Sequence, residues 1–81
     1  MIKTNNAVDM LERLIERIEE RIEALEEKKD ALMEKADEQE RDFTNKEQER
    51  FDSWDEEIEE LEEEKTNIEY ALDYLNEYVD Y

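Results

Sequence analysis

A dense run of acidic residues is the most conspicuous chemical feature of this chain. Positions 55–64 hold eight carboxylates, and only Ile58 and Leu61 interrupt them. Carboxylates can act as general acid and base when a cleft gives two of them different environments, and they can also present a negative surface to a partner. Because Ile58 and Leu61 are three residues apart, they share one side of a helix and leave the carboxylates facing outward. The run therefore predicts a charged helical surface and no catalytic pocket.

Other side chains that carry chemistry are scarce. The sequence has no histidine, no cysteine and no glycine, and Ser53 is its single serine. Nucleophilic catalysis needs a nucleophile beside a base, a di-iron bundle needs a Glu-x-x-His motif, and an EF-hand calcium loop needs a glycine. We therefore expect a protein that is not an enzyme and has no cofactor and no dedicated metal site. Loose condensation of divalent cations on positions 55–64 is the metal interaction that the pattern allows.

Composition narrows the fold class. Of the 81 residues, 49% are charged and 37% are apolar, and glycine and proline are both absent. Glycine and proline form most tight turns, so their absence argues against a β fold and favours a small all-α protein. The first residues lack the apolar segment of a signal peptide, and no run approaches the roughly 18 apolar residues of a membrane span. We expect a soluble intracellular protein without membrane contacts.

Both halves of the chain follow the alternating three- and four-residue spacing of a heptad repeat, and we call these positions the seam. In the first half the seam runs through Val8, Leu11, Ile15, Ile18, Ile22, Leu25, Lys29, Leu32, Ala36, Gln39 and Phe43. In the second half it runs through Phe51, Trp54, Ile58, Leu61, Lys65, Ile68, Leu72, Leu75 and Val79. The spacing predicts two long amphipathic helices.

The two series are out of phase, because Phe43 and Phe51 are eight residues apart where a continuous heptad repeat needs seven. Thr44 and Glu47 have the spacing of a capping box, which marks the start of a new helix. The sequence thus predicts a single domain over residues 1–81, an antiparallel two-helix coiled-coil hairpin. Helix one is expected at about 6–41, the turn at about 42–45 and helix two at about 46–78. The alternative is one unbroken helix of about 70 residues that pairs in parallel with a second chain.

Side-chain volume predicts the register of the hairpin. Placing Ala36 opposite Trp54 pairs a small residue with the largest one. The same register places a lysine, Lys29 or Lys65, opposite a leucine in two layers of the seam. The aliphatic stem of each lysine would lie along the seam while its ammonium reaches neighbouring glutamates.

Tyrosines form a row outside the seam of helix two, and Met10 and Leu14 lie outside the seam at the same end of a hairpin. This apolar surplus either covers a thin core or serves as a contact surface, for which tyrosine is well suited. Its simplest use is a homodimer in which two hairpins form a four-helix bundle. The tyrosines are Tyr70, Tyr74, Tyr78 and Tyr81, and we assign self-association or an apolar anchor to Met10, Leu14, Tyr70, Tyr74 and Tyr78.

Negative charge is concentrated in the second half of the chain. Residues 1–43 hold 14 acidic and 8 basic residues and residues 44–81 hold 15 and 3, so the halves carry -6 and -12 of the total of -18. Along a hairpin about 50 Å long this is about one net charge per 3 Å, where duplex DNA has one per about 1.7 Å. We predict that the acidic surface binds a basic, nucleic-acid-binding protein in place of DNA and does not contact nucleic acid itself. The predicted partner-binding residues are Asp55, Glu56, Glu59, Glu60, Glu62, Glu63 and Glu64.

Other roles also fit the acidic composition. A glutamate-rich face can serve solubility alone, and the chain could be a coiled-coil scaffold, a dimerisation element or an acidic chaperone for a basic protein. Salt separates the inhibitor and the acidic chaperone from the structural coiled coil, because binding driven by charge weakens steeply with salt whereas assembly along an apolar seam does not.

One part of the chain resembles a known family. The residues concerned are Ile22, Leu25, Leu32 and Ala36, then Arg41-Asp42-Phe43-Thr44-Asn45-Lys46-Glu47-Gln48-Glu49-Arg50-Phe51-Asp52, and then Glu57, Ile58 and Leu61. Over about half of the chain, this pattern resembles the delta, or scaffolding, domain of tailed-phage major capsid proteins. The resemblance implies a helix, a capped turn and a second acidic helix in a phage or prophage setting. In that setting we expect an inhibitor of a host defence or DNA-handling protein in the bacterial cytoplasm, for example an anti-CRISPR or anti-restriction protein. A scaffolding element of a phage particle is the alternative.

Overall fold

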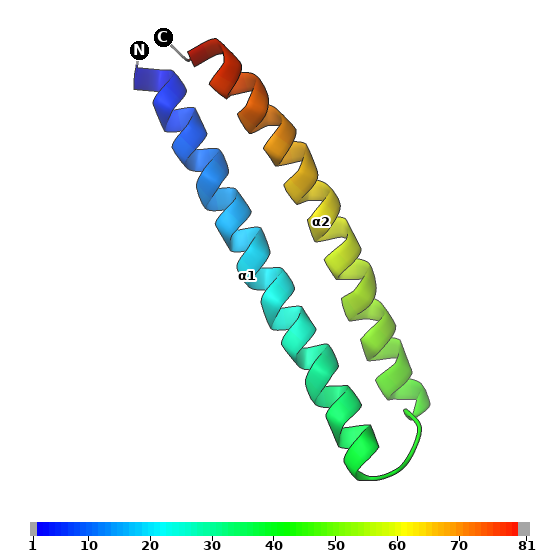
Figure 1. Cartoon of the computed structure of the whole chain (residues 1–81). Coiled ribbons are helices and arrows are strands. Elements are labelled where there is room, and N and C mark those ends of the chain that lie inside the picture. The colour runs from blue at the N-terminus through cyan, green and yellow to red at the C-terminus, as the bar shows by residue number, and fades with distance from the viewer. Residues whose placement is uncertain (1, 80–81) are drawn as a thin grey trace.

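Two long helices and the turn between them make up the fold. The computed structural model describes residues 2–79, with α1 at Ile2–Glu38 and α2 at Asn45–Val79. The helices pack antiparallel as a hairpin, and the described residues contain no strand. The free ends of the two helices lie together at one end of the molecule, the open end, and the turn lies at the other (Figure 1). The predicted all-α hairpin is confirmed, and the single unbroken helix is not formed.

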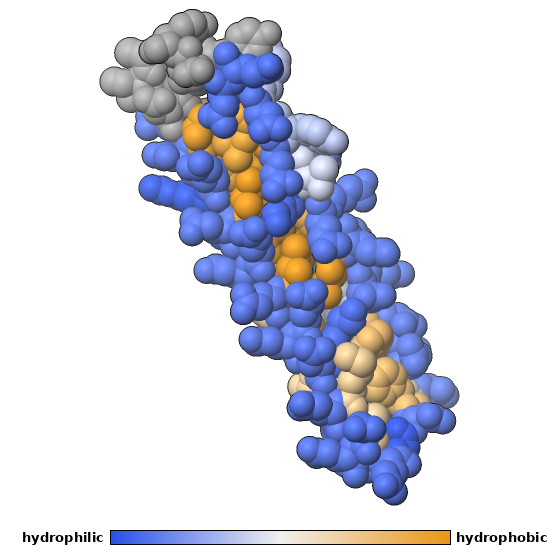
Figure 2. Space-filling model, in the orientation of Figure 1, coloured by the Kyte–Doolittle hydropathy of each residue, from blue (hydrophilic) through white to orange (hydrophobic). Residues whose placement is uncertain are grey.

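The packed side of each helix is the predicted seam. Leu25 is fully buried, and Ile18, Ala36 and Ile58 are at most 9% exposed. The other described seam residues are partly buried, except for Gln39, which is exposed. Apolar surface therefore stays visible as an interrupted strip along the line between the helices, with hydrophilic side chains on both sides (Figure 2). The molecule measures 59 × 16 × 14 Å, so its core is a single thin layer.

The C-terminal end of α1 is closed by a Schellman motif. The amide of Arg41 donates a hydrogen bond to the carbonyl of Ala36, and the amide of Glu40 donates to the carbonyl of Asp37, both at 3.0 Å. Glu40 has a positive φ of 49°, in the left-handed region where glycine is the usual residue. This motif ends α1 at Glu38, three residues before the predicted end near position 41.

The N-terminal end of α2 carries the predicted capping box. The amide of Glu47 donates to the hydroxyl of Thr44 at 3.1 Å, and the amide of Thr44 donates to the Glu47 carboxylate at 2.9 Å. Arg41 adds a two-pronged ion pair, with Nη1 and Nη2 at 2.6 and 3.0 Å from the two carboxylate oxygens of Glu47. Arg41 also donates to the side chain of Gln39 and to the carbonyl of Asp42. One guanidinium thus ties the end of α1 to the first turn of α2.

Glu47 is the one buried charged residue among those described, with 8% of its surface exposed. The hydrogen bond from Arg41, and after it the one from the Thr44 amide, lower the pKa of Glu47 to about 2. The same pair raises the pKa of Arg41. Every buried side-chain polar atom in the described part of the chain has a hydrogen-bond partner.

Ion pairs between the helices show their register. Leu25 and Ile58, each thirteen residues from the turn end of its helix, lie level and are both buried. Ala36 is two residues from the end of α1 and Trp54 is nine from the start of α2, so the predicted pairing of these residues is wrong by one heptad. The ion pairs that show this are Lys29–Asp55 at 2.6 Å, Lys65–Glu19 at 2.9 Å and Arg21–Glu57 at 3.0 Å.

The length of the turn explains why the predicted pairing of Ala36 with Trp54 is wrong. A shift of seven residues keeps every apolar residue on the seam, so the heptad pattern alone does not distinguish the two registers. A turn of six residues, 39–44, sets Ala36 level with Glu47, and both residues are buried. In this register Lys29 lies near Phe51 with its ammonium 4.9 Å from the ring centroid, a cation–π contact, and not opposite a leucine.

The left-handed backbone at Glu40 leads to a first prediction. A residue with a Cβ is disfavoured at this φ by about 1–2 kcal/mol, and glycine relieves this at some entropic cost in the unfolded chain. We expect Glu40→Gly to raise the free energy of unfolding by about 0.5–1 kcal/mol in urea titrations. Glu40→Gln is the control, because it removes the same charge and keeps the Cβ. A Gly variant no more stable than the Gln variant would contradict the prediction.

Glu47 leads to a prediction about pH. A carboxylate whose pKa is depressed on folding stabilises the fold fully above its unfolded pKa, near 4.5, and this contribution disappears as the pH falls towards about 2. Glu47→Gln keeps the capping hydrogen bonds and removes the charge. We expect the thermal midpoint of the parent to exceed that of Glu47→Gln at pH 7, and the difference to shrink between pH 4.5 and 2. Other carboxylates titrate in both proteins and cancel in the difference. A difference that stays constant over this window would refute the assignment.

Candidate functional site

The acidic run lies on the outward side of α2. Ile58 is buried and Leu61 is partly buried against α1. All seven predicted partner-binding residues are exposed, as the helical spacing requires. The structure thus places these carboxylates on one continuous stretch of surface, midway along the hairpin.

Only one of the seven predicted residues is neutralised by the chain itself. The described residues form four ion pairs within 4 Å, and Asp55 takes part in one of them, with Lys29. Glu57 in the same run pairs with Arg21. The six that form no such pair are Glu56, Glu59, Glu60, Glu62, Glu63 and Glu64.

Few basic residues lie near enough to offset the negative charge of positions 55–64. Lys65 is the single basic residue between positions 51 and 81. Its ammonium is directed to Glu19 on α1, and this contact, with smaller contributions from Glu69 and Glu62, raises the pKa of Lys65. Along α2 the unpaired glutamates recur at three- and four-residue spacings, where like charges destabilise a helix. The surface therefore carries electrostatic energy that a positively charged partner would release.

The apolar surplus at the open end is exposed where the structure describes it. Met10 is 64% exposed, Leu14 39%, Tyr70 69% and Tyr74 60%. Tyr81 and the side chain of Tyr78 lie outside the described residues. Counted from the turn, Met10 is nearly level with Tyr74 and Leu14 with Tyr70. The predicted grouping of these residues at one end follows from this register, while their role in self-association stays a prediction.

A second stripe of side chains on α1 was not predicted from the sequence. Only Met10 and Leu14, near its start, were noted there. The stripe consists of the residues that directly precede each seam residue, so it has the same spacing and lies on one side of the seam. From Ala7 to Lys35 it contains no acidic residue, although 29 residues of the chain are acidic. We call it the α1 stripe. It runs through Ala7, Met10, Leu14, Arg17, Arg21 and Ala24 and continues at the same spacing to Lys35.

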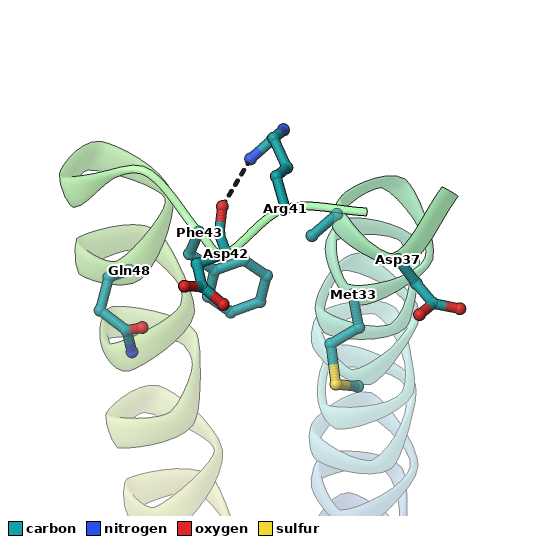
Figure 3. A pocket seen from close by; sticks show the side chains of 7 residues that line it. Met33, Asp37, Arg41, Asp42, Phe43 and Gln48 are labelled. Atoms are coloured by element: carbon teal, nitrogen blue, oxygen red, sulfur yellow. Dashed lines mark hydrogen bonds between the residues drawn. The ribbon is translucent and has the colours of Figure 1, made fainter. Parts of the chain in front are cut away.

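A hollow at the turn offers no second site. This hollow, of about 450 Å³, lies between Met33 on α1, Phe43 in the turn and Gln48 on α2 (Figure 3). It is shallow, and its one cation, Arg41, is already held by Glu47 and by the carbonyl of Asp42. Among the described residues, no group of three or more acidic side chains is arranged to hold a metal ion. Over the same residues, neither helix has a stretch both long and apolar enough to cross a bilayer.

Comparisons with known proteins add no family. No protein-family model, no curated protein and no solved structure matches this chain. The resemblance of the turn region to the phage capsid delta domain therefore stays a prediction. Function has to be inferred from the surface itself.

The unpaired glutamates allow a direct test of their mutual repulsion. Glu59 has four acidic neighbours at three- and four-residue spacings, namely Asp55, Glu56, Glu62 and Glu63. With about 0.2–0.5 kcal/mol for each like-charge pair, Glu59→Gln should raise the free energy of unfolding by about 1 kcal/mol at low salt. The gain should largely disappear in about 1 M NaCl, where the Debye length is about 3 Å.

Glu49→Gln is the matched control for this test. Glu49 is also exposed on α2, but at the same spacings it has one acidic neighbour, Asp52, and one basic neighbour, Lys46. We expect no measurable gain in its free energy of unfolding. Equal gains from Glu59→Gln and Glu49→Gln would show that net charge, and not local crowding, limits the stability of α2.

Proposed function

We propose that this chain is a non-enzymatic interaction protein whose acidic α2 surface occupies the nucleic-acid-binding surface of a basic protein. The observation that carries the proposal is the set of six exposed and unpaired glutamates between positions 56 and 64. Nine helical residues span about 13 Å, which gives one uncompensated charge per about 2 Å. Duplex DNA has one negative charge per about 1.7 Å and a single strand one per about 3.4 Å. The local charge density of α2 therefore lies within the range of nucleic acids.

A rigid helix suits this role for a physical reason. A surface whose charges are already fixed in place loses little conformational entropy on binding. A basic groove that binds phosphates through lysine and arginine gains the same charge pairing from glutamates at similar spacing, and like charge keeps the hairpin away from nucleic acid itself. In this proposal the protein acts in the bacterial cytoplasm as a phage-type inhibitor of a defence or DNA-handling protein. An anti-CRISPR or anti-restriction activity would take this form.

A structural assembly role is the second candidate. The thin core and the exposed Met10, Tyr70 and Tyr74 support it, because a lone two-helix hairpin gains stability when a further helix covers its apolar surface. In that role the chain would be a scaffolding or dimerisation element of a particle, and its glutamates would serve solubility.

Affinity capture distinguishes the two candidates. With the full chain immobilised and a bacterial lysate applied, we expect recovery of a basic nucleic-acid-binding protein that is released by high salt and displaced by duplex DNA. Replacing Glu56, Glu59 and Glu63 with glutamine should reduce its recovery at least about tenfold.

The matched control removes the same charge from α1. Replacing Glu16, Glu20 and Glu27 with glutamine also changes three exposed glutamates that belong to none of the ion pairs. This variant should retain the captured protein. Equal loss from both variants would reduce the interaction to non-specific attraction by net charge. Recovery of capsid or other assembly proteins, with no effect of salt, would favour the structural role.

A further inference from the structure

The residues that precede the seam on α2 form a counterpart to the α1 stripe, which we call the α2 stripe. It includes Ser53, Glu57, Glu60, Glu64, Ala71 and Tyr74. The ion pair between Arg21 and Glu57, at 3.0 Å, joins the two stripes and shows that they lie on the same side of the hairpin. The other two ion pairs between the helices, Lys29–Asp55 and Lys65–Glu19, each join a seam lysine to a carboxylate that follows a seam position and lies on the opposite side. One face of the molecule is thus built from the two stripes together.

The two stripes are complementary in charge at matching levels. Arg17, Arg21 and Lys28 occupy the middle of the α1 stripe, and Glu57, Glu60 and Glu64 occupy the middle of the α2 stripe. Arg17 and Lys28 form none of the ion pairs found among the described residues, despite the excess of carboxylates. Within the hairpin, therefore, this face leaves cations and carboxylates unpaired side by side.

At the open end the two stripes match through apolar and aromatic side chains, and not through opposite charges. Met10 and Leu14 on the α1 stripe, together with Arg13 and Arg17, line a shallow hollow of about 240 Å³ on the surface of α1. At the same levels, the α2 stripe presents Ala71 and Tyr74. An aromatic side chain from another helix would cover both apolar side chains and lie against a guanidinium, a favourable contact for arginine.

We propose that a second copy of this chain covers this face, so that two hairpins form a four-helix bundle with α1 of each copy packed on α2 of the other. The proposal does not rest on the function proposed above. A two-fold axis along the length of the hairpins produces this arrangement and keeps both open ends together. Arg17 then meets Glu64 of the other copy, and Arg21 meets its Glu60. An axis across the hairpins would instead bring Arg21 against Arg21 and Glu60 against Glu60, which like-charge repulsion excludes.

The size of this face and the small side chains on it also favour a second copy of the chain as its occupant. The face is about 59 Å long and 16 Å wide, enough to bury the roughly 800 Å² per partner of a standard interface. Ala24 and Ala31 on the α1 stripe and Ser53 on the α2 stripe are small and permit close approach of the helices. The bundle would also add a second layer to a core in which only four apolar residues of the described chain are now buried. Lys35 and Arg50 near the turn form the one level at which like charges meet.

Net charge opposes association and must be weighed against these contacts. Each copy carries -18, but at physiological ionic strength this repulsion is screened beyond about 8 Å. Paired charges at the interface are closer than that distance and keep most of their attraction. The acidic residues outside the stripes, among them Glu56, Glu59 and Glu63, stay on the outer surface of the bundle.

Sedimentation equilibrium of the full chain at physiological salt tests the proposal, and we expect a dimer. Arg17→Glu should raise the dissociation constant roughly a hundredfold, because two symmetry-related contacts each change from attraction to repulsion at about tenfold apiece. Glu27→Arg is the control. It also reverses one charge on α1, at an exposed position outside the α1 stripe and outside the hollow lined by Met10 and Leu14, and should leave the dissociation constant within about threefold of the parent.

The arrangement of the helices has its own test. Glu64→Arg should also prevent dimerisation, since it places a second guanidinium against Arg17 of the other copy. A mixture of the Arg17→Glu chain with the Glu64→Arg chain should restore a dimer, because every contact between positions 17 and 64 is then of opposite charge. Circular dichroism of each variant checks that it stays helical. A monomeric parent, a dimer unaffected by Arg17→Glu, or a mixture that stays monomeric would each overturn the proposal.

Discussion

The ion pair between Arg41 and Glu47 governs how α1 and α2 meet. It joins the Schellman motif at the end of α1 to the capping box at the start of α2, so the turn has a defined length. A hairpin with a repeating seam has several registers of similar apolar content, and a fixed turn selects one of them. The ion pairs between the helices, and which surface residues of α1 lie level with which of α2, follow from that selection. Leu25 and Ile58 lie level in the same register, and both are buried.

Much of this fold could be predicted from sequence because its determinants are local or periodic. The seam spacing gave both helices, and the Thr44–Glu47 pair gave the start of α2. The register was wrong by one heptad, since side-chain volume ranks two registers that share the same seam only weakly. The register also depends on where α1 ends, and α1 ends at the left-handed Glu40, a position where glycine would have signalled a helix end and a glutamate does not. The burial of Glu47 was missed for the same reason, because it accompanies the turn geometry that holds Glu47 against Arg41.

The candidate surface was likewise predictable only in part. Exposure of the acidic run follows from the two apolar residues within it, so sequence alone located it. Which carboxylates are neutralised depends on the register, and only the structure shows that Asp55 and Glu57 are paired while their neighbours are not. The α1 stripe was readable in principle, since its spacing equals that of the seam. Arg13, Arg17 and Arg21 also form a four-residue row on α1, a pattern typical of charge relief within one helix, and this second pattern makes the stripe harder to recognise.

The two proposals overlap at Glu60 and Glu64, which the dimer would cover, while Glu56, Glu59, Glu62 and Glu63 stay outside the dimer interface. A single hairpin carries about one net charge per 3 Å of its 59 Å length, below the density of duplex DNA. Pairing two copies along their whole length leaves the length unchanged and doubles the charge. The bundle then carries about one net charge per 1.6 Å, close to the duplex value of about one per 1.7 Å. The cations of the α1 stripe would at the same time be covered at the interface, so the outer surface would become more uniformly acidic. Charge pairing between copies would thus produce the surface that a DNA-binding groove accepts.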